Sequence, residues 1–167
     1  MMLVIGIDPG TARTGFGLVE TSASGALKLI HYGVITTPAK QPMAERLIQL
    51  HEGLKELLTS YKPQMGAVEQ LFFQKNVSTA LSVGQARGVV LFTLASSGLE
   101  VEEYSPQDVK QAVTGYGAAD KTQMQRMVQT LLNMKEIPKP DDAADALAVA
   151  ICHIQSHSFR SRLEGSL

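Results

Sequence analysis

The sequence of 167 residues has little cysteine and no long apolar run. Its one cysteine, Cys152, has no partner for an internal disulfide and cannot by itself build a structural zinc site. A reduced, cytoplasmic location is the simplest expectation. No apolar run reaches the roughly 20 residues that span a bilayer, and the apolar start at Met1 lacks the basic residues of a signal peptide. We therefore expect a protein that is neither exported nor inserted in a membrane.

The sequence also lacks an excess of positive charge, with a formal net charge of −1 and a pI near 6.4. Most nucleic-acid-binding proteins are basic, so this balance argues weakly against such a partner. However, cations in a metal site would neutralise clustered acids, and the lysines and arginines elsewhere would then set the binding field. Composition therefore leaves nucleic-acid binding open.

Repeats and low-complexity tracts are absent, and 44% of the residues are hydrophobic. A chain of this length and composition suits one compact α/β domain with a proper core. We expect that single domain to cover residues 1–157. Residues 158–167 are polar and are expected to form a flexible C-terminal tail.

The apolar pattern predicts a mixed sheet of five strands with helices on both faces. Strands are predicted over residues 2–8, 14–20, 27–36, 65–69 and 101–104. Helices are predicted over residues 42–61, 76–97, a short segment opened by Ser105 and Pro106, 120–133 and 141–155. The first strand is apolar nearly throughout, as in a central strand buried on both faces. Short links make the first three strands antiparallel, whereas the last two follow helices and should run parallel to the first.

Two acids stand at the ends of predicted strands. Asp8 ends the first strand, and Glu69 ends the fourth. If these strands are parallel neighbours, both acids emerge at the sheet edge where ligand sites of open α/β sheets lie. Two carboxylates in one crevice repel each other unless a cation joins them.

The last predicted helix carries two more acids. Asp142 and Asp145 are three residues apart, so they share one helix face. The alanines around them keep the helix thin enough to lie close to the sheet, and acids on such an apolar helix need a partner. We therefore expect both to face Asp8 and Glu69. Asp141 is more simply explained as a helix cap, although the doublet leaves open which of its members faces a metal.

The predicted catalytic and metal-binding residues are thus Asp8, Glu69, Asp142 and Asp145. An all-oxygen set without histidine or cysteine suits Mg²⁺, with Mn²⁺ able to substitute. Two such ions about 4 Å apart activate a water and stabilise the leaving oxygen in phosphodiester hydrolysis.

Several short motifs occur in a characteristic order: Ile5-Gly-Ile-Asp-Pro-Gly10, Thr14-Gly-Phe-Gly17, Val68-Glu-Gln70, Gly84-Gln-Ala-Arg-Gly88, Val109-Lys-Gln111 and Asp142-Ala-Ala-Asp-Ala-Leu-Ala148. In this order the sequence resembles the RuvC family of bacterial Holliday-junction resolvases, or crossover junction endodeoxyribonucleases. The resemblance runs from about residue 3 to residue 155. It implies a ribonuclease-H-like fold and a homodimer that makes paired symmetric nicks in four-way DNA junctions during recombination and repair. It also implies the branch-migration proteins RuvA and RuvB as partners, and it places the family's acid tetrad on the four residues above.

Predicted DNA contacts are Phe72, Lys75, Arg87, Lys110 and Lys121. Phe72 falls on the family's stacking aromatic, and an exposed ring beside a nuclease centre can stack on an unpaired base; Phe73 would then anchor the loop. The basic residues could each hold a phosphate, as could Arg126. Gly84 and Gly88 permit close helix approach, either to the sheet or to a second subunit.

Other functions remain open at this point. A nuclease of the same fold group could act on ribosomal RNA precursors. Residues 8–15 also resemble the phosphate loop of actin-like and sugar-kinase ATPases, although those need two lobes and this chain supplies one. A non-catalytic nucleic-acid-binding module is a further alternative, but all four acids are present.

Overall fold

The computed structural model describes residues 1–70 and 77–164, and within these it describes only the backbone of residues 77–79 and 161–164. The strands are β1 (Met2–Asp8), β2 (Arg13–Thr21), β3 (Leu27–Thr36), β4 (Met65–Glu69) and β5 (Glu100–Tyr104). The helices are α1 (Met43–Tyr61), α2 (Val77–Ser96), α3 (Pro106–Thr114), α4 (Lys121–Leu131) and α5 (Asp141–Glu164). Every predicted element is present in the predicted order, and only the end of the last helix differs by more than a few residues.

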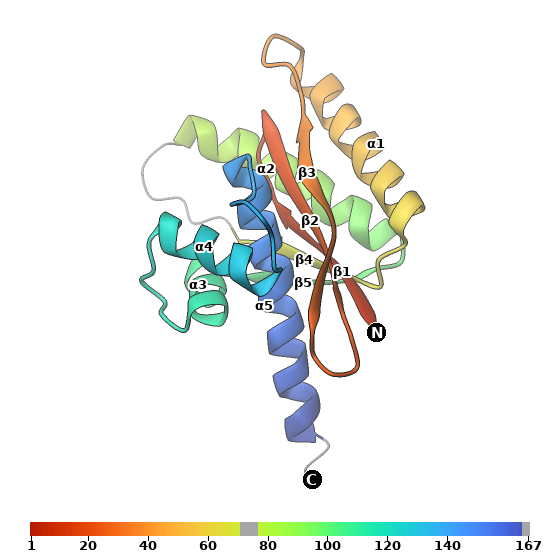
Figure 1. Cartoon of the computed structure of the whole chain (residues 1–167). Coiled ribbons are helices and arrows are strands. Elements are labelled where there is room, and N and C mark those ends of the chain that lie inside the picture. Colours follow the sequence, from red (N-terminus) through yellow and green to blue (C-terminus); the bar gives the residue numbers. More distant parts are fainter. Residues whose placement is uncertain (71–76, 165–167) are drawn as a thin grey trace.

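The five strands form one sheet in the order β3-β2-β1-β4-β5 (Figure 1). β1 pairs antiparallel with β2, and β2 pairs antiparallel with β3. On the other side of β1, β4 runs parallel to it and β5 runs parallel to β4. The predicted mixed sheet is therefore confirmed, with β1 as its central strand.

Successive side chains of β1 point to opposite faces of the sheet, as strand geometry requires. Ile5 and Ile7 belong to the core beneath α1 and α2, whereas Val4 belongs to the core beneath α5. By alternation, Gly6 and Asp8 lie on the α5 face as well. Figure 1 shows α1 and α2 covering one face of the sheet and α5 the other, with α3 and α4 beside α5.

Side-chain caps fix the starts of α3 and α4. The Ser105 hydroxyl accepts a hydrogen bond from the backbone N–H of Asp108 at 3.1 Å, and the Asp120 carboxylate accepts one from that of Gln123 at 2.8 Å. Each contact is reciprocated in a capping box. The predicted serine cap followed by a proline is therefore confirmed.

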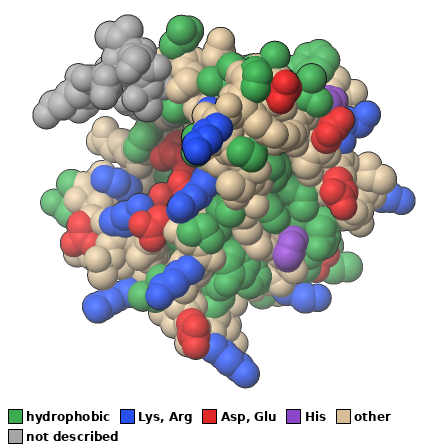
Figure 2. Space-filling view, turned by 90° about the horizontal axis from the view of Figure 1, so that it is seen from above, with side chains coloured by type: hydrophobic (Ala, Val, Ile, Leu, Met, Phe, Trp, Pro, Cys, Tyr) green, Lys and Arg blue, Asp and Glu red, His purple; other side chains and the backbone are tan. Residues whose placement is uncertain are grey.

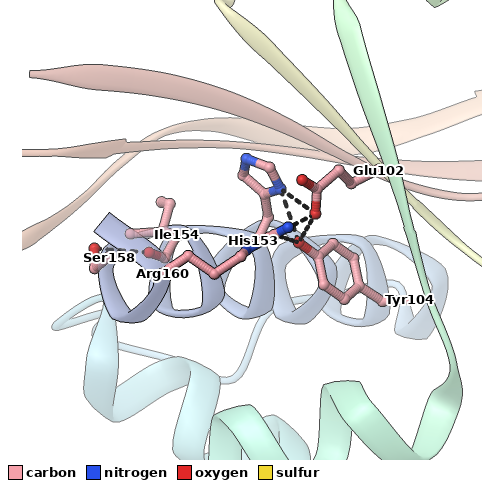
Figure 3. Close-up of polar contacts among 6 residues, drawn as sticks. All are labelled: Glu102, Tyr104, His153, Ile154, Ser158 and Arg160. Atoms are coloured by element: carbon pink, nitrogen blue, oxygen red, sulfur yellow. Dashed lines mark hydrogen bonds and ion pairs between the residues drawn. The ribbon is translucent and has the colours of Figure 1, made fainter. Parts of the chain in front are cut away.

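The last helix is longer than predicted, since α5 continues to Glu164 instead of ending at Gln155. It therefore includes residues 158–164 of the segment expected to be a flexible tail. Its far half is fastened to β5 by a polar cluster (Figure 3). The Tyr104 hydroxyl donates to Glu102 at 2.7 Å and lies 3.0 Å from His153 Nδ1, and Arg160 also donates to Glu102. The sequence pattern missed this extension because Arg160 and Glu102 lie 58 residues apart in the chain.

Within the part of the chain that the structure describes, no helix has both the length and the apolar character needed to cross a bilayer.

Candidate active site

Asp8 and Glu69 leave the sheet next to each other. Ile7 pairs with Val68 across the parallel strands β1 and β4, so the acids that follow these residues occupy adjacent strand ends. Their carboxyl groups are hydrogen-bonded to each other, with Glu69 donating to Asp8. The predicted convergence of these two acids is therefore present in the geometry.

Glycines on the sheet let α5 approach the backbone of β1 and β2. A Cβ added to Gly15 would lie 1.9 Å from the Asp142 carbonyl oxygen, and one added to Gly6 would lie 2.2 Å from that of Ala146. Gly17 faces Leu147 in the same way. No side chain fits between these backbones, since such distances are far below van der Waals contact. The glycines on the sheet and the alanines on the helix together bring Asp142 and Asp145 to the edge where Asp8 stands.

Asp145 completes a group of three interacting carboxyl groups. Burial is the largest effect on Asp8, followed by the negative charge of Asp145, and together they raise its pKa to about 6. Burial and the charges of Asp8 and Asp145 raise the pKa of Glu69 to about 8. Burial also raises the pKa of Asp145. Burial and mutual repulsion thus favour the protonated form of these carboxyl groups, and a bound cation would favour their ionised form.

The two aspartates at the start of α5 point in different directions. The Asp141 carboxylate is exposed and bound to α4, where Lys121 Nζ lies 2.9 Å away and Gln125 donates to it at 2.9 Å. Asp142 lies on the sheet side, and its charge contributes to the raised pKa of Asp8. The structure therefore favours Asp142 over Asp141 as the member of the doublet that faces the acids.

Two lysines line the opening beside the carboxyl groups. A cavity of about 210 Å³ is lined by Glu69, Pro106, Val109, Lys110, Lys121, Met124, Asp145 and Ala148. Lys121 Nζ lies 3.8 Å from Asp145, and the charge of Lys110 partly offsets the raised pKa of Glu69. Seen from above, acidic side chains are recessed among basic ones at this end of the molecule (Figure 2). The predicted positions of Lys110 and Lys121 next to the acids are thus present in the structure.

The carboxyl groups of the four acids do not converge on a single point. Among the described residues, no three histidine, cysteine, aspartate or glutamate side chains form a ready-made metal site. Instead, Lys121 pairs with Asp145 and Arg13 lies 3.9 Å from Asp142. The donor set nevertheless fits a hard divalent cation, because it offers only carboxylate oxygens and carries unrelieved negative charge. The metal-ligand assignment of the four acids stays a prediction.

The remaining predicted DNA contacts have different outcomes. Phe72 and Lys75 lie outside the described residues, as does Phe73. Arg87 is engaged in an ion pair with Glu103 of β5, so its guanidinium already has a carboxylate partner. Arg126 lines a separate cavity of about 370 Å³ with Tyr116 and does not reach the acids.

Sequence reasoning missed Arg13. It opens β2 and lies beside Asp142, with 60% of its side chain exposed. The pattern gave no sign of this contact, because only the pairing of β1 with β2 carries Arg13 back to the edge where Asp8 stands.

The fold and the site define an enzyme class: a ribonuclease-H-like nuclease with acids at the carboxyl edge of a mixed sheet. The family model described as crossover junction endodeoxyribonuclease RuvC matches residues 4–153. The chain therefore belongs to the RuvC family of crossover junction endodeoxyribonucleases.

Similar proteins agree over nearly the whole chain. The crossover junction endodeoxyribonuclease RuvC of Syntrophomonas wolfei is 54% identical over 165 residues, which cover 99% of this chain and 95% of that protein. RuvC of Chloroflexus aurantiacus is 59% identical over 152 residues, or 91% of this chain and 92% of that protein. The structure of Thermus thermophilus RuvC in complex with a Holliday junction substrate superposes with a TM-score of 0.90 at 37% identity, covering 95% of this chain and 96% of that one. These similarities favour the junction nuclease over the RNA-precursor nuclease, the ATPase and the binding module.

Proposed function

We propose that this protein cuts four-way DNA junctions by hydrolysing a phosphodiester bond at the Asp8–Glu69 edge of its sheet. The observation that carries the proposal is the hydrogen-bonded pair of Asp8 and Glu69 at the ends of parallel strands, with Asp145 of α5 acting on both. Membership in a family of junction endodeoxyribonucleases supports the choice of substrate. Paired symmetric nicks would resolve the junction into two duplexes during recombination and repair.

Asp8, Glu69, Asp142 and Asp145 would hold two Mg²⁺ ions, and Mn²⁺ could replace them. The ions would supply an activated water and neutralise charge on the leaving oxygen. For the site to bind them, Glu69 and Asp8 must lose the protons that their raised pKa values retain. Lys121 and Arg13 must also give up their contacts with Asp145 and Asp142.

Lys110 and Lys121 would hold the phosphates on either side of the scissile bond. Both line the cavity that contains Glu69 and Asp145. A lysine at this distance from the reacting group can also stabilise the charge that develops on the phosphorus centre. Phe72 and Lys75 are further proposed DNA contacts, and they follow Glu69 closely in the sequence.

A homodimer is the proposed assembly, because paired cuts in a two-fold substrate need two sites. The surface of α2 supports it. Leu81 and Phe92 are 69% and 64% exposed, and a Cβ added to Gly84 or Gly88 would meet nothing within 4 Å. These residues recur on one helical stripe, so the glycines are not used for packing inside the subunit. A second copy of α2 could approach closely along this stripe.

The dimer can be tested with Phe92→Asp, which places a charge on the stripe. The matched control is Phe159→Asp, at an equally exposed phenylalanine (65%) near the far end of α5. Sedimentation should show monomers for the α2 variant and dimers for the control. A dimeric Phe92→Asp protein would move the interface elsewhere.

RuvA and RuvB are proposed partners on the strength of the family resemblance. A cytoplasmic location is likewise part of the proposal, since the substrate is intracellular DNA.

The experiment that tests the function is incubation with labelled four-way junctions and with linear duplex of the same sequence. We expect Mg²⁺-dependent paired nicks in the junction alone. Cutting that needs no divalent cation, or that favours the duplex, would overturn the proposal. Cleavage of structured RNA in place of the junction would favour the RNA-precursor nuclease.

A further inference from the structure

We propose that Arg13 is a DNA-phosphate-binding residue that is held by Asp142 until a divalent cation takes that carboxylate. This inference rests on the proposed function and adds to it a residue, a ligand group and an order of events. It follows from three features. Arg13 lies at the acid edge of the sheet, hydrogen bonds from Thr37 hold the loop before it, and its ion pair with Asp142 resembles the ion pair of Lys121 with Asp145.

The pairing of β1 with β2 places Arg13 at the acid edge. Asp8 pairs with Gly15, and Arg13 precedes Gly15 by two residues, so its side chain lies on the same face of the sheet. That face is covered by the first turn of α5. Arg13 Nη1 lies 3.9 Å from Asp142 Oδ2, with the two side chains 60% and 36% exposed. The guanidinium is therefore at the rim of the site, in contact with both a carboxylate and solvent.

The loop that leads to Arg13 is held from behind. The hydroxyl of Thr37, which is only 4% exposed, donates to the Thr11 carbonyl at 2.6 Å and accepts from Arg46 Nε at 3.0 Å. The Thr37 backbone N–H donates to the Ala12 carbonyl at 3.1 Å. Polar contacts of a buried threonine are costly to break. These hydrogen bonds fix the backbone of the loop after Asp8, and the long Arg13 side chain extends from it toward α5.

Arg13 and Lys121 flank the acids from opposite elements. Lys121 of α4 contacts Asp145, and Arg13 of β2 contacts Asp142. A carboxylate that ligates a divalent cation has less charge left for a monovalent partner, so ion binding would release the guanidinium. A released, exposed guanidinium has the forked geometry that binds a phosphate through two hydrogen bonds. When Asp142 exchanges Arg13 for a divalent cation, the freed guanidinium would bind a DNA phosphate. Binding of the cation would thus strengthen binding of the DNA backbone.

The first experiment measures Mn²⁺ binding to the protein alone by titration with electron paramagnetic resonance. The variants are Arg13→Ala, Arg13→Lys and the control Lys55→Ala, which removes the charge of an exposed lysine on α1. Because the alanine removes a competitor for Asp142, we expect Mn²⁺ to bind about 2–5-fold more tightly, the range of an exposed ion pair. The other two variants should bind like the wild type. Weaker Mn²⁺ binding in Arg13→Ala would overturn the exchange, because it would mean that Arg13 only supports the site.

The second experiment measures junction binding and single-turnover cleavage at saturating Mg²⁺. Arg13→Ala should cut about 10-fold more slowly and should lose about one unit from the slope of log affinity against log salt. Arg13→Lys should recover the salt slope and part of the rate, and Lys55→Ala should match the wild type. An Arg13→Ala protein with unchanged rate and salt slope would overturn the phosphate contact. A wild type that binds Mn²⁺ but cuts no junction would instead count against the proposed function.

Discussion

Helix α5 carries two polar clusters, and their carboxylates behave in opposite ways. Near its first turn, burial and mutual repulsion raise the pKa of Asp8 and Glu69. Further along, Arg160 and Tyr104 donate hydrogen bonds to Glu102, and these contacts lower the pKa of that carboxyl. Both clusters bridge the same helix to the same sheet. The cations near the first cluster, Lys110 and Lys121, offset its raised pKa values only in part, whereas Arg160 pairs directly with Glu102 in the second.

This difference indicates that the cluster around Asp8 is suited to bind a ligand, whereas the cluster around Glu102 stabilises the fold. A carboxylate that satisfies its charge within the protein has little affinity left for a cation. The close packing of α5 on glycines holds the group around Asp8 together against its own repulsion, and a bound cation would relieve that repulsion. Replacing a carboxylate by an amide should therefore have different effects on stability and cleavage at the two clusters.

The largest effect is expected for Asp8→Asn compared with Glu102→Gln, since each replaces a carboxylate by an amide. Asp8→Asn should lower the single-turnover cleavage rate by roughly three orders of magnitude or more, because it removes a proposed cation ligand. Junction binding should stay within about threefold, since the phosphate contacts remain. Glu102→Gln should cut at nearly the wild-type rate. Comparable rates for the two variants would show that the acids at the sheet edge are not the cutting site.

Gly15→Ala should separate α5 from the sheet. Its added carbon would lie 1.9 Å from the Asp142 carbonyl, and overpacking against backbone that cannot move costs about 3 kcal/mol or more of the free energy of unfolding. The control Gly53→Ala meets only the Ile35 side chain, at 3.2 Å or more, and should change stability by less than about 1 kcal/mol. Denaturant unfolding measures both. Equal stability of the two variants would contradict the close packing of α5.

The pH dependence of the metal-free protein should expose the unneutralised cluster. A carboxyl whose folded pKa is raised favours folding below its unfolded pKa, and this contribution is lost as pH rises through the folded value. For Glu69 the window runs from its ordinary value of 4.5 to about 8. In EDTA, the Tm should therefore fall across that range. Glu69→Gln should flatten the decline, and saturating Mg²⁺ should reverse it in the wild type.

Glu102 has the opposite sign in the same titration. Its lowered pKa stabilises the fold above the ordinary value of 4.5 and loses that contribution as pH falls through the folded value. Glu102→Gln should thus lower the Tm at neutral pH, where Glu69→Gln raises it in EDTA. A decline that persists unchanged in Glu69→Gln would show that other groups cause it.

The smallest effect is expected for Tyr104→Phe, which removes one hydroxyl from the structural cluster. That hydroxyl donates to Glu102 and contacts buried His153, so its loss should cost about 1–2 kcal/mol of the free energy of unfolding. This corresponds to a Tm lower by about 2–8 °C. The control Tyr32→Phe removes a hydroxyl that makes no hydrogen bond among the described residues and should change little. A loss of cleavage in Tyr104→Phe, with stability intact, would mean that this cluster also serves the active site.

Much of the architecture could be predicted because it depends on local pattern. The apolar run of residues 2–8 identified a central strand, and the strand ends identified Asp8 and Glu69. The spacing of Asp142 and Asp145 identified a shared helix face. The end of α5 was predicted wrongly, because the contact that extends the helix comes from β5.

The sequence by itself determined the order of the elements, the alternation of the strands and the four acids proposed to bind metal, since these follow from side-chain periodicity along a short stretch. Only the tertiary structure decided which member of the Asp141–Asp142 doublet turns to the sheet, that Arg87 pairs with Glu103, and that Arg13 lies against Asp142. The physical reason is distance along the chain. A charged side chain pairs with the groups that tertiary packing brings close to it. These groups are often far apart in the sequence, where no local pattern connects them.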